Sequence, residues 1–269
     1  MDIDIYELLI NIIMNENVKI ISFANHKGGV GKTTTTASVG TVLAKQGKNV
    51  LLIDLDAQAN LTNSLLNGVS VDKTIYDALI AESKGKAMNL PVYKVKDNLD
   101  IVPASLELAY ADLQLSTTMA REYLLKEMLN RKQNFYDYIL IDCPPSLGLL
   151  TLNAITASDN VVIPLLAEVL PFQGLTMIKD FIEMVQNRLN PKVKIGGILL
   201  TRWENSNLSK QIEDGLRSRL GKEVFNSKIR KNIKVAEAPL ETINIVDYAP
   251  KSNGAIDYTN FTKELITTI

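Results

Sequence analysis

The residues with the clearest chemistry lie in one glycine-rich stretch, HKGGVGKTT, at residues 26–34. Glycine has no Cβ, so a glycine-rich turn can point successive backbone N–H groups at one anion, next to the positive end of a following helix. A nucleotide's phosphates fit such a turn. Lys32 can reach the terminal phosphates as a mobile charge, and the Thr33 hydroxyl can ligate the Mg²⁺ that bridges them. The residues predicted to contact the nucleotide here are Gly28, Gly29, Val30, Gly31, Lys32, Thr33 and Thr34.

Two further apolar runs end in acidic residues. The run at 48–54, KNVLLID, continues into a second carboxylate at Asp56, and the run at 136–142, YDYILID, ends at Asp142. Ligands of parallel α/β sheets collect at the carboxyl ends of the strands, which puts these acids beside the glycine-rich turn. Asp142 is therefore predicted to hold the Mg²⁺, directly or through a water, as the aspartate of a Walker B strand does.

The elements that must position these residues follow from the hydrophobic pattern. The apolar, β-branched run at 18–23 predicts a buried strand that ends at the glycine-rich turn, and a helical pattern follows over 32–44. Further strands are predicted at 48–54, 99–103, 136–142, 159–164 and 193–201, and further helices at 74–82, 118–131, 172–189 and at the end of the chain. This alternation predicts the α/β class, with a mostly parallel twisted sheet and helices on both faces.

The glycine-rich stretch departs from the usual G-x-x-x-x-G-K-[ST] pattern, because His26 stands where a glycine is expected and Lys27 follows it. The stretch resembles the deviant Walker A sequence K-G-G-x-G-K-T of the ParA-type and MinD-related partition and cell-division ATPases. The resemblance implies a P-loop fold with ATP and Mg²⁺ as cofactors. It also implies that Lys27 is the signature lysine, which crosses a dimer interface to the nucleotide of the partner subunit.

The segment D-x-D-x-Q at 54–58 resembles switch I of this family. The resemblance implies that Asp56 orients the attacking water and belongs to the metal shell together with Thr33 and Asp142. The catalytic residues it predicts are therefore Lys27, Lys32 and Asp56.

Other segments are also similar to the family. Residues 144–148 resemble switch II, and YAPKSNGAIDY at 248–258 resembles Y-D-P-x-S-x-G-A-x-x-Y. The family places base-contacting residues after the strand at 193–201, which implies that Thr201 and Arg202 contact the nucleotide base. An exposed, salt-bridging Arg202 is the alternative.

The formal net charge is −1, so any nucleic-acid binding must come from a local patch. Lysine and arginine gather in the basic cluster, residues 209–234. The residues predicted to contact DNA phosphates are Arg217, Arg219, Lys222, Lys231 and Lys234, with a solvated helix face as the alternative. The segment IRKNIKVAEAP at 229–239 resembles the family's I-P-R-N-V-R-L-S-E-A-P, although Arg230 replaces its proline.

With 269 residues and 46% hydrophobic composition, the chain is predicted to form one domain over residues 18–269. Residues 1–17 form an acidic, apolar extension, predicted to be a short amphipathic helix that packs on its own domain or on a partner. The single cysteine, Cys143, excludes an internal disulfide framework and is predicted to pack in the core. No run reaches the roughly 20 apolar residues that span a membrane, and a cytoplasmic location is expected.

The resemblance implies a ParA-like ATPase that forms an ATP-dependent homodimer and binds double-stranded DNA nonspecifically. A ParB-like partner would stimulate hydrolysis, so that a nucleoid-associated, ATP-bound form segregates or positions plasmid or chromosomal DNA. A MinD-like ATPase acting on a membrane or protein scaffold is the alternative, although the closing KELITTI lacks the basic face of a membrane anchor. An electron-transfer ATPase needs paired cysteines for an iron–sulfur cluster and is excluded, while a non-catalytic regulatory binder stays open.

Overall fold

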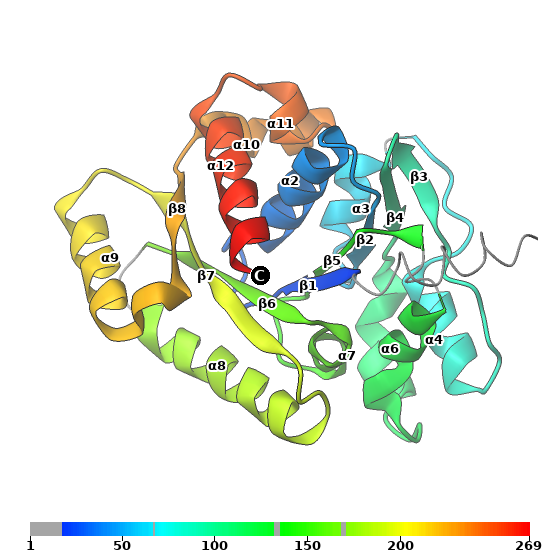
Figure 1. Ribbon diagram of the computed structural model, residues 1–269. Coiled ribbons are helices and arrows are strands. Elements are labelled where there is room, and N and C mark those ends of the chain that lie inside the picture. The colour runs from blue at the N-terminus through cyan, green and yellow to red at the C-terminus, as the bar shows by residue number, and fades with distance from the viewer. Residues whose placement is uncertain (1–17, 67, 132–134, 168–170) are drawn as a thin grey trace, which may run out of the picture.

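A computed structural model describes residues 18–66, 68–131, 135–167 and 171–269, and its centre is an eight-stranded sheet (Figure 1). The strand order is β3-β4-β2-β5-β1-β6-β7-β8, and the pairing is parallel except between β3 and β4. The strands are β1 (Lys19–Phe23), β2 (Val50–Asp54), β3 (Tyr93–Lys96), β4 (Leu99–Val102), β5 (Tyr138–Asp142), β6 (Asn160–Leu166), β7 (Lys194–Trp203) and β8 (Val224–Arg230). The predicted α/β class with a mostly parallel sheet is confirmed.

Helices cover both faces of the sheet. Figure 1 shows α2, α11 and α12 on one side and α4, α6, α7 and α8 on the other. The α-helices described are α2 (Lys32–Lys45), α3 (Asn60–Leu65), α4 (Ile75–Ser83), α5 (Ala111–Gln114), α6 (Leu124–Asn130), α7 (Leu149–Ala157), α8 (Pro171–Arg188), α9 (Asn207–Leu220), α10 (Ile233–Glu237), α11 (Ile245–Tyr248) and α12 (Asn253–Thr268). None of these helices is both long enough and apolar enough to cross a bilayer.

Each face of the sheet has its own apolar core, because the side chains of a strand alternate between the two faces. In β5, Ile139 and Ile141 pack into the core beneath α4, α6 and α7, whereas Leu140 packs into the core beneath α2 and α12. All three are fully buried. Central strands covered on both faces must be apolar throughout, which is why the strand runs were visible in the sequence.

Most predicted elements are present, with ends that differ by one or two residues. The helix predicted at 118–131 is wrong over its first part, since Ala120 adopts a left-handed φ of 53° and α6 begins only at Leu124, after one 3₁₀ turn. The strands β3 and β8 were missed, because they are edge strands with mixed polar and apolar side chains. The extension predicted as a helix, residues 1–17, lies outside the described residues.

The strand order brings the three motifs together. Strands β2, β5 and β1 are neighbours, and in the pairing register both Phe23 and Asp54 stand opposite Asp142. The two acidic strand ends, which are more than 80 residues apart in the chain, therefore meet the glycine-rich turn at one edge of the sheet.

Candidate nucleotide-binding site

The phosphate loop, residues 24–31, joins β1 to α2. Asn25 anchors its start, because its side-chain amide donates to a β6 carbonyl at 2.8 Å and its side-chain oxygen accepts from the N–H two residues on at 3.0 Å. Gly29 and Gly31 have φ values of 70° and 88°, in the left-handed region that favours glycine. A Cβ placed on Gly28 or Gly29 would meet nothing within 4 Å. The loop therefore offers an open backbone surface at the start of α2.

Lys32 is the first residue of α2, and its side chain is only 6% exposed. Its ammonium group donates to the Lys27 carbonyl at 3.1 Å. Burial lowers the pKa of Lys32, and the nearby Asp142 carboxylate is the largest influence that raises it. A partly dehydrated cation held beside the loop is suited to binding a phosphate oxygen.

Asp142, the last residue of β5, is 1% exposed. No described group donates to either carboxylate oxygen within normal hydrogen-bond geometry. Burial raises the pKa of Asp142 well above its usual range and Asp54 adds to the rise, whereas the Thr33 hydroxyl and the Lys32 ammonium lower it. A buried acceptor that lacks donors and faces a threonine hydroxyl fits a cation, because burying it unpaired costs free energy.

The donor set also fits Mg²⁺ in particular. Among the described residues, no three acidic, histidine or cysteine side chains gather as a metal cluster. Mg²⁺ bound with a nucleotide needs no such cluster, since it takes one or two carboxylates and completes its shell with waters and phosphate oxygens. Thr33 and Asp142 supply the oxygen ligands that such a site requires.

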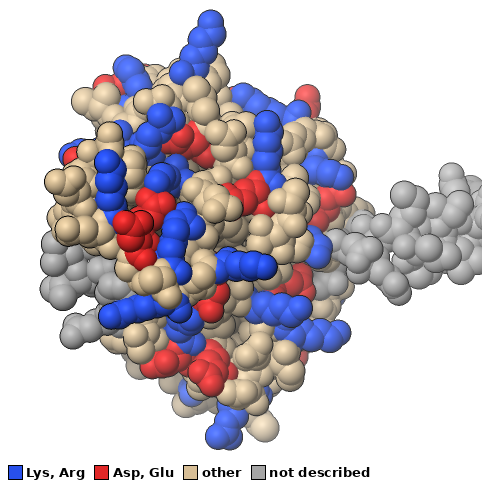
Figure 2. All heavy atoms as spheres, turned by 60° about the vertical axis from the view of Figure 1, so that its left-hand side comes forward, with Lys and Arg blue, Asp and Glu red and all other residues tan. Residues whose placement is uncertain are grey.

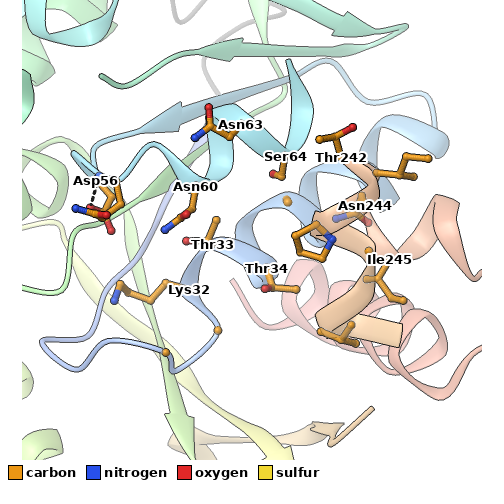
Figure 3. Close-up of a pocket in the computed structure, with 18 of the residues that line it drawn as sticks. Lys32, Thr33, Thr34, Asp56, Asn60, Asn63, Ser64, Thr242, Asn244 and Ile245 are labelled. Carbon is orange, nitrogen blue, oxygen red and sulfur yellow. Dashed lines mark hydrogen bonds between the residues drawn. The ribbon is translucent and has the colours of Figure 1, made fainter. Parts of the chain in front are cut away.

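Asp56 lies two residues beyond the end of β2 and is half-buried. Its carboxylate accepts from the Gln58 N–H at 3.0 Å, and its own N–H donates to Asp54 at 3.1 Å. Figure 3 shows Asp56, Lys32, Thr33 and Asn60 around one hollow. The structure thus brings the predicted phosphate, metal and water-positioning residues together.

That hollow is a cavity of about 560 Å³, a size suited to a small-molecule ligand. One wall is the phosphate loop and α2, another is the segment from Asp56 to Ser64, and the third comes from the C-terminal part of the chain (Figure 3). The lining of this third wall includes Val235, Ala238, Pro239, Thr242, Ile243, Asn244 and Ile245.

Comparison with known proteins agrees with this geometry. Residues 18–195 match a protein family described as AAA domain. The chain is 41% identical over 249 residues to the sporulation initiation inhibitor protein Soj of Bacillus subtilis (strain 168), covering 92% of this chain and 98% of that protein. It is 38% identical over 254 residues to the chromosome partitioning protein ParA of Caulobacter vibrioides, covering 93% and 94%. The chain belongs to the ParA and Soj family of partition ATPases.

The fold of this ParA-family chain also matches a crystal structure of cobyrinic acid a,c-diamide synthase from Mycobacterium smegmatis with bound ADP and magnesium. The TM-score is 0.80 at 32% sequence identity, over 93% of this chain and 94% of that chain. The P-loop fold predicted from the phosphate loop is therefore confirmed.

The ParA-family chain has a second cavity, of about 550 Å³, on the other side of the phosphate loop. Thr201 and Arg202, the predicted base contacts, line this cavity and not the first one. The Thr201 hydroxyl donates to the Val30 carbonyl at 2.9 Å, while Arg202 is exposed. Residues common to both cavity walls are Gly29, Gly31, Thr34, Val235 and Pro239, so the two cavities border each other.

Lys27, the predicted signature lysine, has an exposed side chain at the rim of the loop. Helix α8 approaches it closely. A Cβ on Gly174 would lie 2.5 Å from the His26 ring and 3.3 Å from Lys27 Cε, so only glycine allows this approach. Lys27 therefore lies against α8 with an exposed side chain, unlike the buried Lys32.

The predicted DNA contacts have different environments. Arg217 makes structural contacts, because it bonds to Glu213 and donates to the carbonyls of Val224 and Phe225 at 3.1 and 2.8 Å. The other four are exposed, with Lys231 paired to Glu204 and Lys234 to Glu237. Figure 2 shows acidic side chains among the basic ones on this side of the molecule, and no unbroken basic surface. The four exposed residues of this predicted set are Arg219, Lys222, Lys231 and Lys234.

Sequence reasoning gave no role to Asp54 or to Thr62. Asp54 is fully buried beside the site, and its carboxylate accepts two hydrogen bonds from Thr62. The only sequence signal was the first aspartate of D-x-D, whose partner eight residues later cannot be recognised without the fold. The prediction that Cys143 packs in the core is confirmed, since it is fully buried.

Proposed function

We propose that this partition ATPase binds ATP with Mg²⁺ at the phosphate loop and hydrolyses the γ-phosphate with Asp56 as the water-positioning group. The observation that carries the proposal is the buried, donor-free carboxylate of Asp142 facing Thr33 and Lys32. Mg²⁺ held by Thr33 and Asp142 would supply Lewis-acid neutralisation of phosphate charge. Lys32 would hold the terminal phosphates, and Asp56 would orient water at the cavity wall.

The nucleotide base would occupy the second cavity. Its walls carry Thr201 and Arg202, together with apolar side chains such as Ile229 and Ile233 against which a ring would pack. The shared border at Gly31 and Thr34 lets one nucleotide reach from this cavity to the first. The observation that supports this assignment is the position of both cavities against the same loop.

The ATP-bound chain would form a homodimer in which Lys27 of each subunit reaches the partner's phosphates. The exposure of Lys27 supports this role, since a buried lysine could not leave its own subunit. Charge from a second subunit would add electrostatic stabilisation of the transition state. Residues 18–269 would act as one ATPase domain.

The dimer would bind double-stranded DNA nonspecifically, through phosphate contacts from Arg219, Lys222, Lys231 and Lys234, and a ParB-like partner would stimulate hydrolysis. Release and rebinding would position plasmid or chromosomal DNA in the cytoplasm, with the ATP-bound form on the nucleoid. The Lys231 and Lys234 ion pairs are exposed, so exchanging their acidic partners for DNA phosphates would cost little.

Phosphate release and DNA binding test this function together. The full chain with Mg²⁺ should hydrolyse ATP and should bind random-sequence duplex DNA with ATP but not with ADP, more weakly as salt rises. The double variant Lys222→Ala, Lys231→Ala should weaken DNA binding. The matched control is the double variant Lys84→Ala, Lys86→Ala, which removes the same charge just beyond α4, at the other edge of the sheet. This control should leave DNA binding unchanged. A wild type without ATP binding or turnover would refute the ATPase proposal, and equal effects of both variants would refute the DNA surface.

A further inference from the structure

A buried chain of hydrogen bonds joins the loop that carries Asp56 to the end of β4. Asp54 Oδ1 accepts from the Asp56 N–H at 3.1 Å. Asp54 Oδ2 accepts from both the N–H and the hydroxyl of Thr62, at 2.9 and 2.8 Å. The Thr62 oxygen in turn accepts from the Ala104 N–H at 2.9 Å. We call these four residues the Asp54–Thr62 relay.

The relay closes a loop at both of its ends. The chain leaves the sheet at Asp54 and returns to the same carboxylate at Thr62, in the first turns of α3. Between these anchors lie Asp56 and Asn60, two polar residues that line the first cavity. The position of the Asp56 carboxylate is therefore set by how firmly this short loop is held.

The loop between Asp54 and Thr62 contains a strained residue, so it depends on contacts that hold its conformation. Ala59 has φ 51° and ψ 32°, a left-handed conformation that is unfavourable for a residue with a Cβ. Such a conformation persists only where the surrounding contacts determine it. Asp54 and Thr62 are 0% and 6% exposed, so water cannot replace their hydrogen bonds. The relay fastens this strained loop to the sheet through side chains, in addition to the backbone bond that the Leu55 N–H donates to the Asp142 carbonyl at 3.0 Å.

We propose that Thr62 and Asp54 are positioning residues for ATP hydrolysis, which hold Asp56 at the wall of the cavity and touch neither nucleotide nor metal. This inference rests on the proposed function of the site. Thr62 is absent from the walls of both cavities, so its hydroxyl can act on the reaction only through Asp54 and the loop. Misplacing a catalytic group by about 1 Å can cost on the order of a hundredfold in rate.

A matched pair of substitutions isolates the hydroxyl. Thr62→Val keeps the shape of the side chain and the backbone N–H bond to Asp54, but its side chain can neither donate to Asp54 nor accept from the Ala104 N–H. Thr62→Ser keeps both hydrogen bonds and loses one methyl group. We expect kcat for ATP to fall by about tenfold to a hundredfold in the valine variant with KM changed by less than about threefold, and rescue to within about threefold in the serine variant.

A second substitution tests Asp54, the other positioning residue of the Asp54–Thr62 relay. Asp54→Asn preserves volume, but its NH₂ group must face either the Asp56 N–H or the donors of Thr62. A donor against a donor breaks one arm of the relay. The variant should reproduce the loss of kcat, and ADP affinity measured in parallel should stay within about threefold of wild type. Loss of ADP binding, or a valine variant that matches the serine variant in kcat, would overturn the positioning role.

Hydrogen exchange of the nucleotide-free chain separates this inference from the proposed function. Amides at 55–61 should exchange about tenfold faster in Thr62→Val, with α2 and β5 unchanged, and Thr62→Ser should resemble wild type. Unchanged exchange at 55–61 would refute the relay even in an active ATPase. Faster amide exchange at 55–61 in Thr62→Val, in a protein whose wild type does not hydrolyse ATP, would show that the relay holds the loop but does not serve hydrolysis. That outcome would refute both the proposed function and the positioning role.

Discussion

Arg230 at the end of β8 and Asp257 in α12 form a two-point ion pair, with the guanidinium Nη2 2.6 Å and Nε 2.9 Å from the two carboxylate oxygens. The Arg230 N–H also donates to Asp257, at 3.0 Å. Proline, which the similar family segment carries at this position, has no N–H to donate. The pair therefore fastens the last strand to the last helix, and it includes a backbone bond that a proline at position 230 could not make.

Replacing Arg230 should lower stability. Arg230→Ala removes both charged hydrogen bonds and leaves an 8% exposed carboxylate with one donor, so the free energy of unfolding should fall by about 2 kcal/mol. Arg230→Lys keeps the charge without the planar fork and should lose about half of that. Urea unfolding measures both, and an unchanged midpoint in Arg230→Ala would show that the pair contributes nothing.

Replacing Lys32 should abolish ATP turnover. Lys32→Ala removes the buried cation beside Asp142, and steady-state phosphate release should fall by about a hundredfold or more. Lys48→Ala, an exposed lysine in the turn before β2, is the control and should behave like wild type. Normal turnover in the Lys32 variant would mean that the phosphates bind elsewhere.

Replacing Lys27 should separate nucleotide binding from dimerisation. Among the described residues, the exposed Lys27 side chain forms no hydrogen bond or ion pair with Asp142, so Lys27→Ala should still bind ATP. ATP-driven dimerisation should be lost, because the partner's phosphates lose their second cation. Sedimentation with and without ATP measures this, and an ATP-dependent dimer of the variant would remove the signature-lysine role.

Replacing Asp56 should trap the ATP-bound state. Asp56→Asn keeps an oxygen that can accept from the Gln58 N–H but loses the charge, and Asp56→Ala loses both. Both should retain ATP and accumulate the dimer, with hydrolysis at least about tenfold slower. Unchanged hydrolysis in either variant would show that another group positions the water.

The ion pairs of Glu213 should make stability depend on pH. Burial acts to raise the pKa of Glu213, but Lys228 and Arg217 outweigh it and the net pKa is lowered below 4.5. A depressed carboxyl pKa contributes stability above the unfolded value, which is lost as pH falls through the folded value. Glu213→Gln should therefore cost about 1 kcal/mol or less at pH 7, and the difference should shrink as the pH falls below the unfolded pKa and through the lower, folded pKa of Glu213.

Urea unfolding of wild type and Glu213→Gln between pH 7 and pH 3.5 measures this difference. The control is Asp214→Asn, which removes one acidic charge at an exposed neighbouring position. If the difference in unfolding free energy between wild type and Glu213→Gln grew as the pH fell, the ion pairs of Glu213 would not be the cause of the stability difference.

The sequence by itself determined the class of fold, and it predicted which residues meet at the candidate nucleotide site. Strands β1, β2 and β5 are buried on both faces, so their apolar runs are continuous, and their polar ends must lie at one edge of a parallel sheet. Asp142 ends such a run and Asp56 lies two residues beyond another, whereas Lys32 and Thr33 could be predicted from the glycine-rich turn that follows the first run. The edge strand β8 lacks that signal and was read only as part of the basic cluster.

Only the tertiary structure decided which polar groups are free to act. Arg217 counted as a DNA contact in the sequence, but its guanidinium holds the backbone of β8. Nothing in the sequence distinguished the hydroxyl of Thr62, yet it joins Asp54 to Ala104, which lies 42 residues beyond Thr62 in the chain. Such hydrogen bonds depend on how separate strands and loops pack in three dimensions, which local periodicity does not encode.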